Sequence, residues 1–229
     1  MQNSYSKNTY EQDYFWVNQM TRVFGWMFLG LLISGVSAMA TLSTGVVSVL
    51  SSTVLLIIAL IEIGLVVYLS KRAMSMEYST AALWFMIYSA LNGVTLSIIF
   101  YAYTLGSIAI SFFMAAGFFA FMSFYGMVTK SDLTKAGKLA FMGLIGLIIA
   151  GVVNLFMQSS MIYWITSFVG VIVFLALTAY DSQRIKDIHN SYVGTQKEQN
   201  VAIIGALILY LDFINLFLYI LRVLGKRRN

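Results

Sequence analysis

Two aspartates, Asp181 and Asp212, lie within long apolar stretches and are the residues best placed to do chemistry. Asp212 is near the middle of the run 201–222, which is long enough to cross a membrane as one helix of about 20 residues. A carboxylate at that depth costs at least about 2.5 kcal/mol by insertion scales, so an acid there marks a functional site with a partner. The sequence spacing indicates that this partner is Asp181.

The two acids are equally far in sequence from a point between Gln196 and Lys197, inside the polar stretch 191–200. If the preceding helix runs to about Asn190 and the chain then turns, both carboxylates lie roughly 15–20 Å from the turn, at 1.5 Å per residue. Two carboxylates at one depth in a medium of low dielectric cannot both stay ionised at low cost, so they would titrate as a unit. Such a pair is a proton sensor or a cation site, and oxygen ligands suit hard cations such as Ca²⁺.

Each acid also has a purely structural interpretation. Asp212 would be protonated and hydrogen-bonded to a neighbouring Ser or Asn. Asp181 would form an ordinary ion pair with Arg184, three residues further along the same helix. Either interpretation removes the need for a coupled pair.

Polar residues continue along the last apolar run. Asn215, Tyr219 and Arg222 follow Asp212 at spacings of three, four and three residues, which puts all four side chains on one helix face. This polar seam needs a protein interior or a water-lined path around it. The last helix is therefore predicted to be central in its bundle.

Three further residues could contribute to the site. Glu62 lies eight residues before the end of the second apolar run at Ser70, about 12 Å from the charged surface, and could approach the acid pair, face a separate pocket or reach toward the interface. Arg72 is either a surface anchor or a cation that reaches the acid pair and holds it shut. His189 is interpreted as a solvated loop residue, because a single His without other ligands does not make a metal site.

Composition assigns the chain to the polytopic membrane proteins. It is 60% hydrophobic and 10% charged over 229 residues, whereas soluble domains are about 45–50% apolar and about 25% charged. The net charge of +5 comes from bases between apolar runs, which indicates loops at a membrane surface and gives no nucleic-acid footprint.

The sequence has no Gly-rich phosphate loop, no nucleophile with a base and no cluster of zinc or iron ligands. It therefore predicts no catalytic residue and no cofactor, and it argues against an enzyme.

Seven apolar runs predict an all-α integral membrane domain over residues 23–229, after a polar cytoplasmic segment at 1–22. The runs are about 23–42, 46–70, 80–103, 107–128, 139–157, 161 or 162 to the region of Asp181, and 201–222. Small residues recur every four positions in the first and third runs, and such stripes let helices pack closely. These stripes are Gly30, Ser34 and Ala38, and Ser89, Gly93 and Ser97.

The connections between the runs alternate between basic and uncharged, and the basic ones, including Lys7, fall on the side of the N-terminus. By the positive-inside rule the N-terminus is cytoplasmic. The basic stretch 226–228 departs from the rule, because seven spans put it on the other side. Either the chain crosses seven times, or the last run dips into the membrane and returns. Seven spans are favoured, since that run is long enough and ends at Arg222 as an interfacial anchor.

Four segments resemble the Bax inhibitor family, also called the transmembrane Bax inhibitor motif family. AYDSQRIK at 179–186 and LYLDFINLF at 209–217 are similar to its signature, and YSALNGVTLSIIF at 88–100 and TKSDLT at 129–134 are similar to its bacterial members. The resemblance covers about residues 20–228. It implies seven helices with the last in the middle of the other six, in the cytoplasmic (inner) membrane of a bacterium.

The resemblance also implies roles for particular residues. In family members that act as channels, the aspartates matching Asp181 and Asp212 form a pH-sensing pair that governs a Ca²⁺ leak. An acid that Glu62 matches is linked to the ion path. A basic residue latches the closed state, and its nearest match is Arg72, with Lys71 as the alternative.

Two functions are therefore compared as hypotheses. The first is a Ca²⁺ leak channel gated by protonation of the acid pair, with the bilayer, Ca²⁺ and protons as its partners. The second is a non-conducting interaction protein that modulates a membrane protease or a stress or cell-death response, a role that some bacterial relatives permit. A cation/proton antiporter is a weaker third hypothesis. Ca²⁺ flux as a function of pH tests the channel, a partner whose binding survives loss of both acids would favour the interaction protein, and concentrative, gradient-dependent uptake would favour the antiporter.

Overall fold

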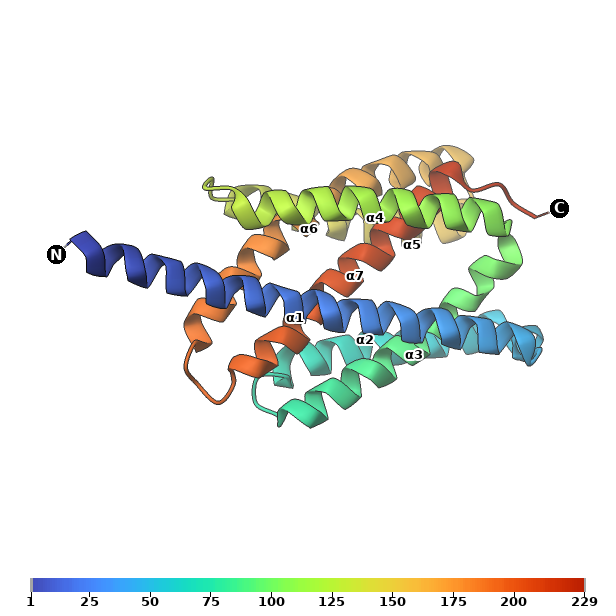
Figure 1. Cartoon of the computed structure of the whole chain (residues 1–229). Coiled ribbons are helices and arrows are strands. Elements are labelled where there is room, and N and C mark those ends of the chain that lie inside the picture. Colours follow the sequence, from blue (N-terminus) through green and yellow to red (C-terminus); the bar gives the residue numbers. More distant parts are fainter. Residues whose placement is uncertain (1, 229) are drawn as a thin grey trace. The chain divides into compact units, whose positions relative to one another are not determined.

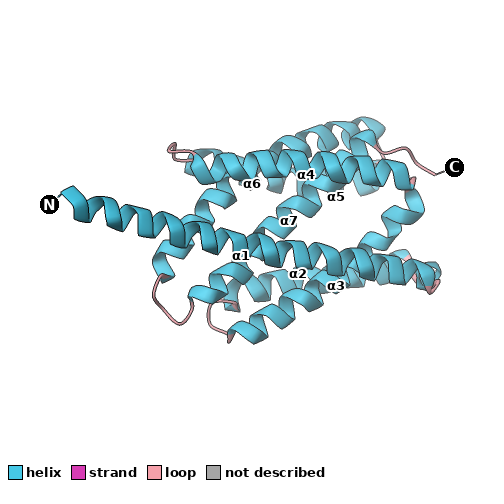
Figure 2. Cartoon of the chain, viewed as in Figure 1, coloured by secondary structure: helices cyan, strands magenta, loops and turns pink. Residues whose placement is uncertain are grey.

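The structure is a computed structural model that describes residues 2–228, without the side chains of residues 2–15 and 48. The predicted segment 1–22, with Lys7, lies largely outside the described side chains. The chain forms one helix after another, drawn in sequence colours in Figure 1 and as helices and loops in Figure 2. The helices are α1 (Gln2–Ser43), the short 3-10 helix η1 (Val46–Val49), α2 (Ser52–Arg72), α3 (Tyr78–Ala102), α4 (Leu105–Val128), α5 (Thr134–Met157), α6 (Ser160–Tyr192) and α7 (Glu198–Leu224).

Seven of these helices are long and apolar enough to cross a membrane, the first over Trp16–Ser43. The protein is thus an all-α polytopic membrane protein, as the apolar runs predict. α7 differs from the rest, since 72% of its most apolar window is buried, against at most 33% in the other six. A helix that hides this much of its surface is one that other helices surround, which agrees with the predicted central position.

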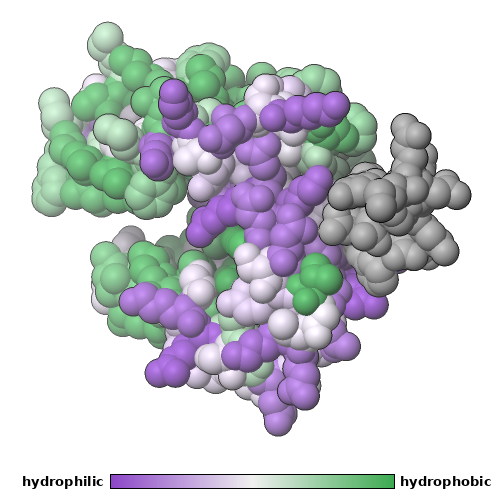
Figure 3. Space-filling view, turned by 90° about the vertical axis from the view of Figure 1, so that its left-hand side faces the viewer, coloured by the Kyte–Doolittle hydropathy of each residue, from purple (hydrophilic) through white to green (hydrophobic). Residues whose placement is uncertain are grey.

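The helices form two compact units. Unit 1 comprises Met1–Ile98 and Ile185–Ile208, and unit 2 comprises Ile99–Arg184 and Leu209–Asn229. Figure 3 shows the loop ends of helices, where hydrophilic side chains (purple) gather, while hydrophobic side chains (green) cover the helix flanks. This distribution is typical of helices with lipid along their sides and water at their ends.

The second helix begins later than the sequence predicts. The chain turns at Gly45, whose φ of 72° lies in the left-handed region, and passes through η1 before α2 starts at Ser52. Ser51 is the N-cap, and its side chain accepts a hydrogen bond from the backbone N–H of Val54 at 3.3 Å. The predicted start at residue 46 was wrong because hydropathy does not register a cap inside an apolar run.

The two small-residue stripes meet within unit 1, between α1 and α3. A Cβ atom added to Gly93 would collide with the backbone of Ser34, and one added to Gly30 would collide with the ring of Phe85. The Ser34 hydroxyl donates to the carbonyl oxygen of Ser89 at 2.7 Å, and the Ser37 hydroxyl donates to that of Ala90 at 2.7 Å. The predicted close packing of these stripes is confirmed.

Candidate functional site

α6 and α7 carry the two aspartates, and both residues belong to unit 2. Asp181 is 8% exposed and Asp212 is 5% exposed, so both acids are buried. Asp181 is eleven residues before the end of α6 at Tyr192, and Asp212 is fourteen residues after the start of α7 at Glu198. At 1.5 Å per residue, these positions lie about 17 Å and about 21 Å from the turn, close to the predicted heights.

α4 fixes the backbone of α6 on both sides of Asp181. Gly126 of α4 packs against the carbonyl group of Ala179, with no room for a Cβ atom between them. Three residues further on, the hydroxyl groups of Ser123 and Ser182 are 2.7 Å apart in a buried hydrogen bond. Close backbone contact and a buried polar pair together hold Asp181 at a defined position.

Gln183 fixes the loop between α4 and α5 to the same stretch of α6. Its Oε1 atom accepts a hydrogen bond from the backbone N–H of Leu133 at 2.9 Å, and its Nε2 atom donates to the carbonyl oxygen of Ser131 at 2.9 Å. The loop therefore lies against α6 two residues beyond Asp181. The family resemblance includes both the loop segment 129–134 and the α6 segment 179–186. The sequence spacing between them does not predict that they make these two hydrogen bonds.

Asp181 has a cationic partner on its own helix. Its Oδ1 atom is 3.6 Å from Nη1 of Arg184, whose side chain is 54% exposed. This is the ion pair of the structural interpretation given above. Because water screens the exposed guanidinium, such a pair contributes little, typically about 0–1 kcal/mol.

Asp212 is in a different electrostatic environment. Its Oδ2 atom is buried and has no hydrogen-bond partner among the described residues. Asp181 is the acidic neighbour near enough to interact with this carboxyl group when both are ionised. A buried acceptor without a partner costs about 1–3 kcal/mol, and more when charged. A proton or a cation at Asp212 would lower this cost.

The other polar residues of α7 make contacts of their own. Asn215 donates from Nδ2 to the carbonyl oxygen of Leu211 on the same helix at 2.8 Å. The ring of Tyr219 stacks on that of Phe174, with centroids 5.6 Å apart, and the Arg222 guanidinium lies over the Tyr219 ring at 5.1 Å. The predicted seam therefore divides into an amide that bonds to its own helix and an aromatic and cationic stack near the end of α7.

Glu62 is buried within unit 1, at 9% exposure. It accepts a hydrogen bond at 2.7 Å from the hydroxyl of Thr95 on α3, and the Asn92 amide is a second partner. Thr95 and Asn92 are three residues apart and thus share one face of α3. Sequence reasoning missed Thr95, although this three-residue spacing was a usable signal. The role of Glu62 in an ion path stays a prediction.

Arg72 is the last residue of α2, with an exposed side chain in unit 1. Its carbonyl oxygen accepts hydrogen bonds from the Ser75 hydroxyl at 2.8 Å and from the backbone N–H groups of Ser75 and Met76. These bonds close the turn that follows α2. Whether Arg72 or Lys71 acts as a latch stays a prediction.

His189 is not the solvated loop residue that the sequence suggests. It lies within α6, is 2% exposed, and its ring is 6.0 Å from that of Trp16. α6 ends at Tyr192, so His189 is still helical and lies one turn after the fully buried Ile185 on the same face. That four-residue spacing was the signal that could have located it inside the helix.

Among the described residues, the two aspartates have no further metal-binding side chains around them. No group of three or more His, Cys, Asp or Glu side chains gathers around a possible ion in the part of the chain that the structure describes. The prediction of Ca²⁺ at Asp181 and Asp212 is not tested by this observation, because two carboxylates can contact an ion in passage.

Comparison with known proteins extends the resemblance over nearly the whole chain. The sequence family described as "Inhibitor of apoptosis-promoting Bax1" matches residues 17–229. "Inner membrane protein YbhL" of Escherichia coli strain K12 is 43% identical over 215 residues, which are 91% of this chain and 92% of that protein. An uncharacterized protein of Borreliella burgdorferi is 45% identical over 214 residues, 92% of each chain. One from Rickettsia prowazekii is 41% identical over 212 residues, 92% of this chain and 90% of its own length.

Proposed function

This chain belongs to the Bax inhibitor family, and we propose that it is a pH-sensitive leak channel for cations, chiefly Ca²⁺, gated by Asp181 and Asp212. The observation that carries the proposal is the buried Oδ2 atom of Asp212, which has no hydrogen-bond partner among the described residues and lies within reach of the charge of Asp181. A carboxyl group in that situation responds to protons and to cations more strongly than an exposed one.

The gating argument rests on charge repulsion. When both carboxyl groups are ionised, their repulsion in a medium of low dielectric favours either separation of α6 from α7 or entry of a cation between them. One added proton removes that repulsion and weakens the attraction of the pair for a cation. The pair therefore has two arrangements whose populations depend on pH, and a difference of about 1.4 kcal/mol between them is enough for a tenfold change.

The cation argument rests on ligand chemistry. Ca²⁺ takes six to eight oxygen ligands in stable sites. Two carboxylates without a third acidic neighbour in the described residues supply part of that number. Such a partial set suits brief contact with a passing ion better than storage. The proposed role is transport and requires no enzymatic chemistry.

Two further residues have proposed roles. Glu62 would contact cations on the path, since it is a buried acid with hydroxyl and amide partners. Arg72, or Lys71 beside it, would act as the counter-ion of the closed state. Both are proposed from charge type and family resemblance.

We also propose where the protein acts. The relative from Escherichia coli is named an inner membrane protein, and the basic connections on the side of the N-terminus favour a cytoplasmic N-terminus. The proposed channel would thus lie in the bacterial inner membrane.

Ca²⁺ flux into proteoliposomes, measured as a function of pH, tests the proposal. The wild type is expected to have a flux that changes steeply with pH, and Asp212→Asn is expected to remove most of that dependence. Asp187→Asn is the matched control, since the same change is made at an exposed acid on α6. Its profile should match the wild type.

Three outcomes would overturn the proposal. Superimposable profiles for the wild type and Asp212→Asn would eliminate the acid pair as the gate. Absence of Ca²⁺ flux from well-folded wild type at every pH would favour the non-conducting interaction protein. Concentrative uptake driven by an imposed proton gradient would favour the antiporter.

A further inference from the structure

The last residues of the chain are fixed to the turn between α3 and α4, within unit 2. The backbone N–H of Thr104 donates to the carbonyl oxygen of Lys226 at 3.1 Å, and that of Arg228 donates to Ala102 at 3.0 Å. The backbone N–H of Lys226 donates to the Ser107 hydroxyl at 2.9 Å. Tyr103 and Arg227 thereby form an antiparallel bridge. This basic tail, residues 225–228, is therefore held in place at the end of α7.

Four cations gather at this position: Arg222, Lys226, Arg227 and Arg228. The Arg222 guanidinium lies 5.1 Å from the centre of the Tyr219 ring and 5.8 Å from that of Tyr163. The Arg227 guanidinium donates hydrogen bonds to the hydroxyl groups of Tyr163 and Tyr103. Aromatic rings and hydroxyls thus orient two of the cations and leave their charges uncompensated.

No carboxylate of the described residues compensates these charges. The only ion pair found in that part of the chain joins Arg184 to Asp181. Within unit 2 the described acids are Asp132, in the loop between α4 and α5, and the buried pair at 181 and 212. Asp132 follows the end of α4, whereas the tail is bonded to the turn before the start of α4. The described acids of unit 2 therefore leave the positive charges of the tail without a carboxylate partner.

The tail lies at the end of unit 2 where α3 ends and where α4 and α6 begin. Exposed aromatic side chains, Tyr101 at the end of α3 and Trp164 in the first turns of α6, surround the same end of unit 2. The 3.3 Å contact between the hydroxyls of Tyr103 and Tyr163 brings these two helix ends together. Such aromatic residues mark the boundary between hydrocarbon and water, where lipid phosphates are found.

We propose that Arg222, Lys226, Arg227 and Arg228 form a binding site for the phosphate group of an anionic phospholipid. The lipid would lie in the leaflet on the side opposite to the N-terminus, since seven spans place the two ends of the chain on opposite sides. The lipid phosphate would pair with these cations. The acyl chains would lie along the exposed apolar flank near Trp164. None of these four cations has a role in the proposed function.

Fluorescence quenching in nanodiscs tests the site. Phosphatidylglycerol with brominated acyl chains is titrated into phosphatidylcholine nanodiscs that hold the full chain, and brominated phosphatidylcholine gives the reference. The Trp164 signal is the difference between the wild type and Trp164→Phe. The wild type is expected to bind phosphatidylglycerol in preference to phosphatidylcholine. Lys226→Gln with Arg228→Gln should reduce the preference about fivefold for each cation removed.

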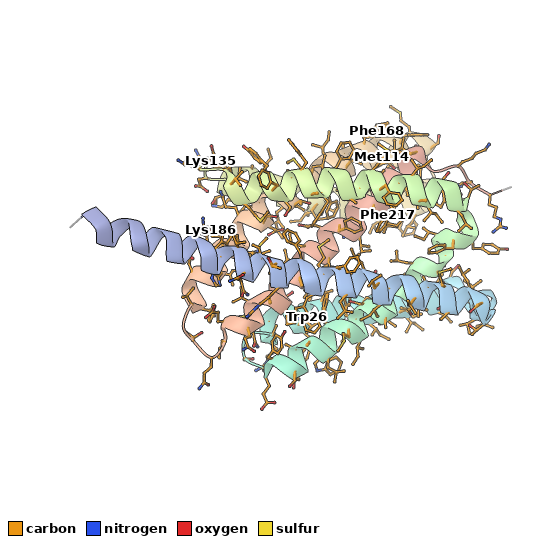
Figure 4. All side chains as sticks on the ribbon, in the orientation of Figure 1. Trp26, Met114, Lys135, Phe168, Lys186 and Phe217 are labelled. Atoms are coloured by element: carbon orange, nitrogen blue, oxygen red, sulfur yellow. The ribbon has the colours of Figure 1, made fainter. Side chains whose placement is uncertain are left out.

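Two matched variants separate charge from folding. Lys226→Arg with Arg228→Lys keeps both charges and should keep the preference. Lys135→Gln with Lys138→Gln removes two charges from the start of α5, and Figure 4 labels Lys135 at the other end of unit 2 from the tail. That variant should also keep the preference. The tail variant leaves the bonds between Arg227 and the tyrosines in place, so it is expected to fold.

Three results would overturn the site. In the first, the wild type has no preference for phosphatidylglycerol. In the second, the preference survives in the Lys226→Gln and Arg228→Gln variant. In the third, inorganic phosphate at equal anion concentration displaces the brominated lipid, which would make this a site for free anions instead of lipid.

Discussion

Gly126 of α4 lies directly against the carbonyl group of Ala179 of α6, two residues before Asp181. Because the obstacle is backbone, it cannot turn aside as a side chain would. Gly126→Ala should therefore push the two helices apart and lower the free energy of unfolding by about 1–3 kcal/mol. Gly117→Ala is the control on the same helix, since a Cβ atom there meets nothing within 4 Å. Equal stability of the two variants in detergent would contradict the close contact.

The hydrogen bond between Thr95 and Glu62 should contribute measurably to stability. Thr95→Val keeps the shape of the side chain but removes the hydroxyl donor from a buried carboxyl group, with an expected loss of about 1 kcal/mol. Thr95→Ser should lose less, because it keeps the donor. Thr21→Val is the matched control, since the exposed Thr21 bonds only to its own helix. A double-mutant cycle with Glu62→Gln measures the coupling, and a coupling of zero would refute the interaction.

Asn200 joins the start of α7 to the end of α2. Its Nδ2 atom donates to the carbonyl oxygens of Ala73 at 2.6 Å and Met76 at 2.9 Å. Asn200→Asp replaces the donor with a second acceptor that faces two carbonyl oxygens, so it should destabilise by about 2–4 kcal/mol and more than Asn200→Ala. Asn190→Asp makes the same change at an exposed position and should be nearly neutral. Thermal unfolding should rank the three variants in stability, with Asn200→Asp the least stable, Asn200→Ala next and Asn190→Asp close to the wild type.

Asp132 should make stability depend on pH below the neutral range. Hydrogen bonds from the Thr134 hydroxyl and from its backbone N–H, the latter at 2.8 Å, hold the pKa of Asp132 below its ordinary value of 3.8. A carboxyl group whose pKa falls on folding stabilises the folded state above its ordinary pKa. That contribution disappears as the pH falls through the folded-state value.

Asp132→Asn keeps an acceptor for Thr134 but has no charge to titrate. The wild type should unfold at a higher temperature than the variant by a constant amount near neutral pH. This difference should narrow as the pH falls below the ordinary pKa of 3.8. A gap that widens on acidification would contradict the assignment. The other carboxylates are common to both proteins and cancel in the comparison.

Hydropathy alone predicted the number of helices and most of their positions. A membrane requires every backbone polar group to be satisfied within the segment, so each apolar run of sufficient length becomes a helix. The small-residue stripes predicted which faces of α1 and α3 a neighbouring helix could approach closely, because Gly30 and Gly93 leave room for it. They did not predict that these two helices would meet each other. Helix ends were less predictable, since the cap at Ser51 depends on one side-chain bond.

The candidate site could be predicted in part. Burial of Asp212 follows from its place in a long apolar run, and the ion pair of Asp181 with Arg184 follows from a spacing of three. The orphaned Oδ2 atom of Asp212 could not be predicted, because it depends on which side chains the neighbouring helices present. The hydrogen bonds of Gln183 with the α4–α5 loop, and those of the tail, join residues 50 or more positions apart in the sequence. No local sequence pattern predicts contacts over such separations.

The seam between α1 and α3 has a consequence for measuring motion. Two hydroxyl-to-carbonyl bonds and the contact of Gly93 with the Ser34 backbone leave these helices no room to slide past each other. They should move as one piece in any rearrangement of the protein. A pair of spin labels placed across this seam would serve as a constant reference length against which displacements of other helices can be calibrated.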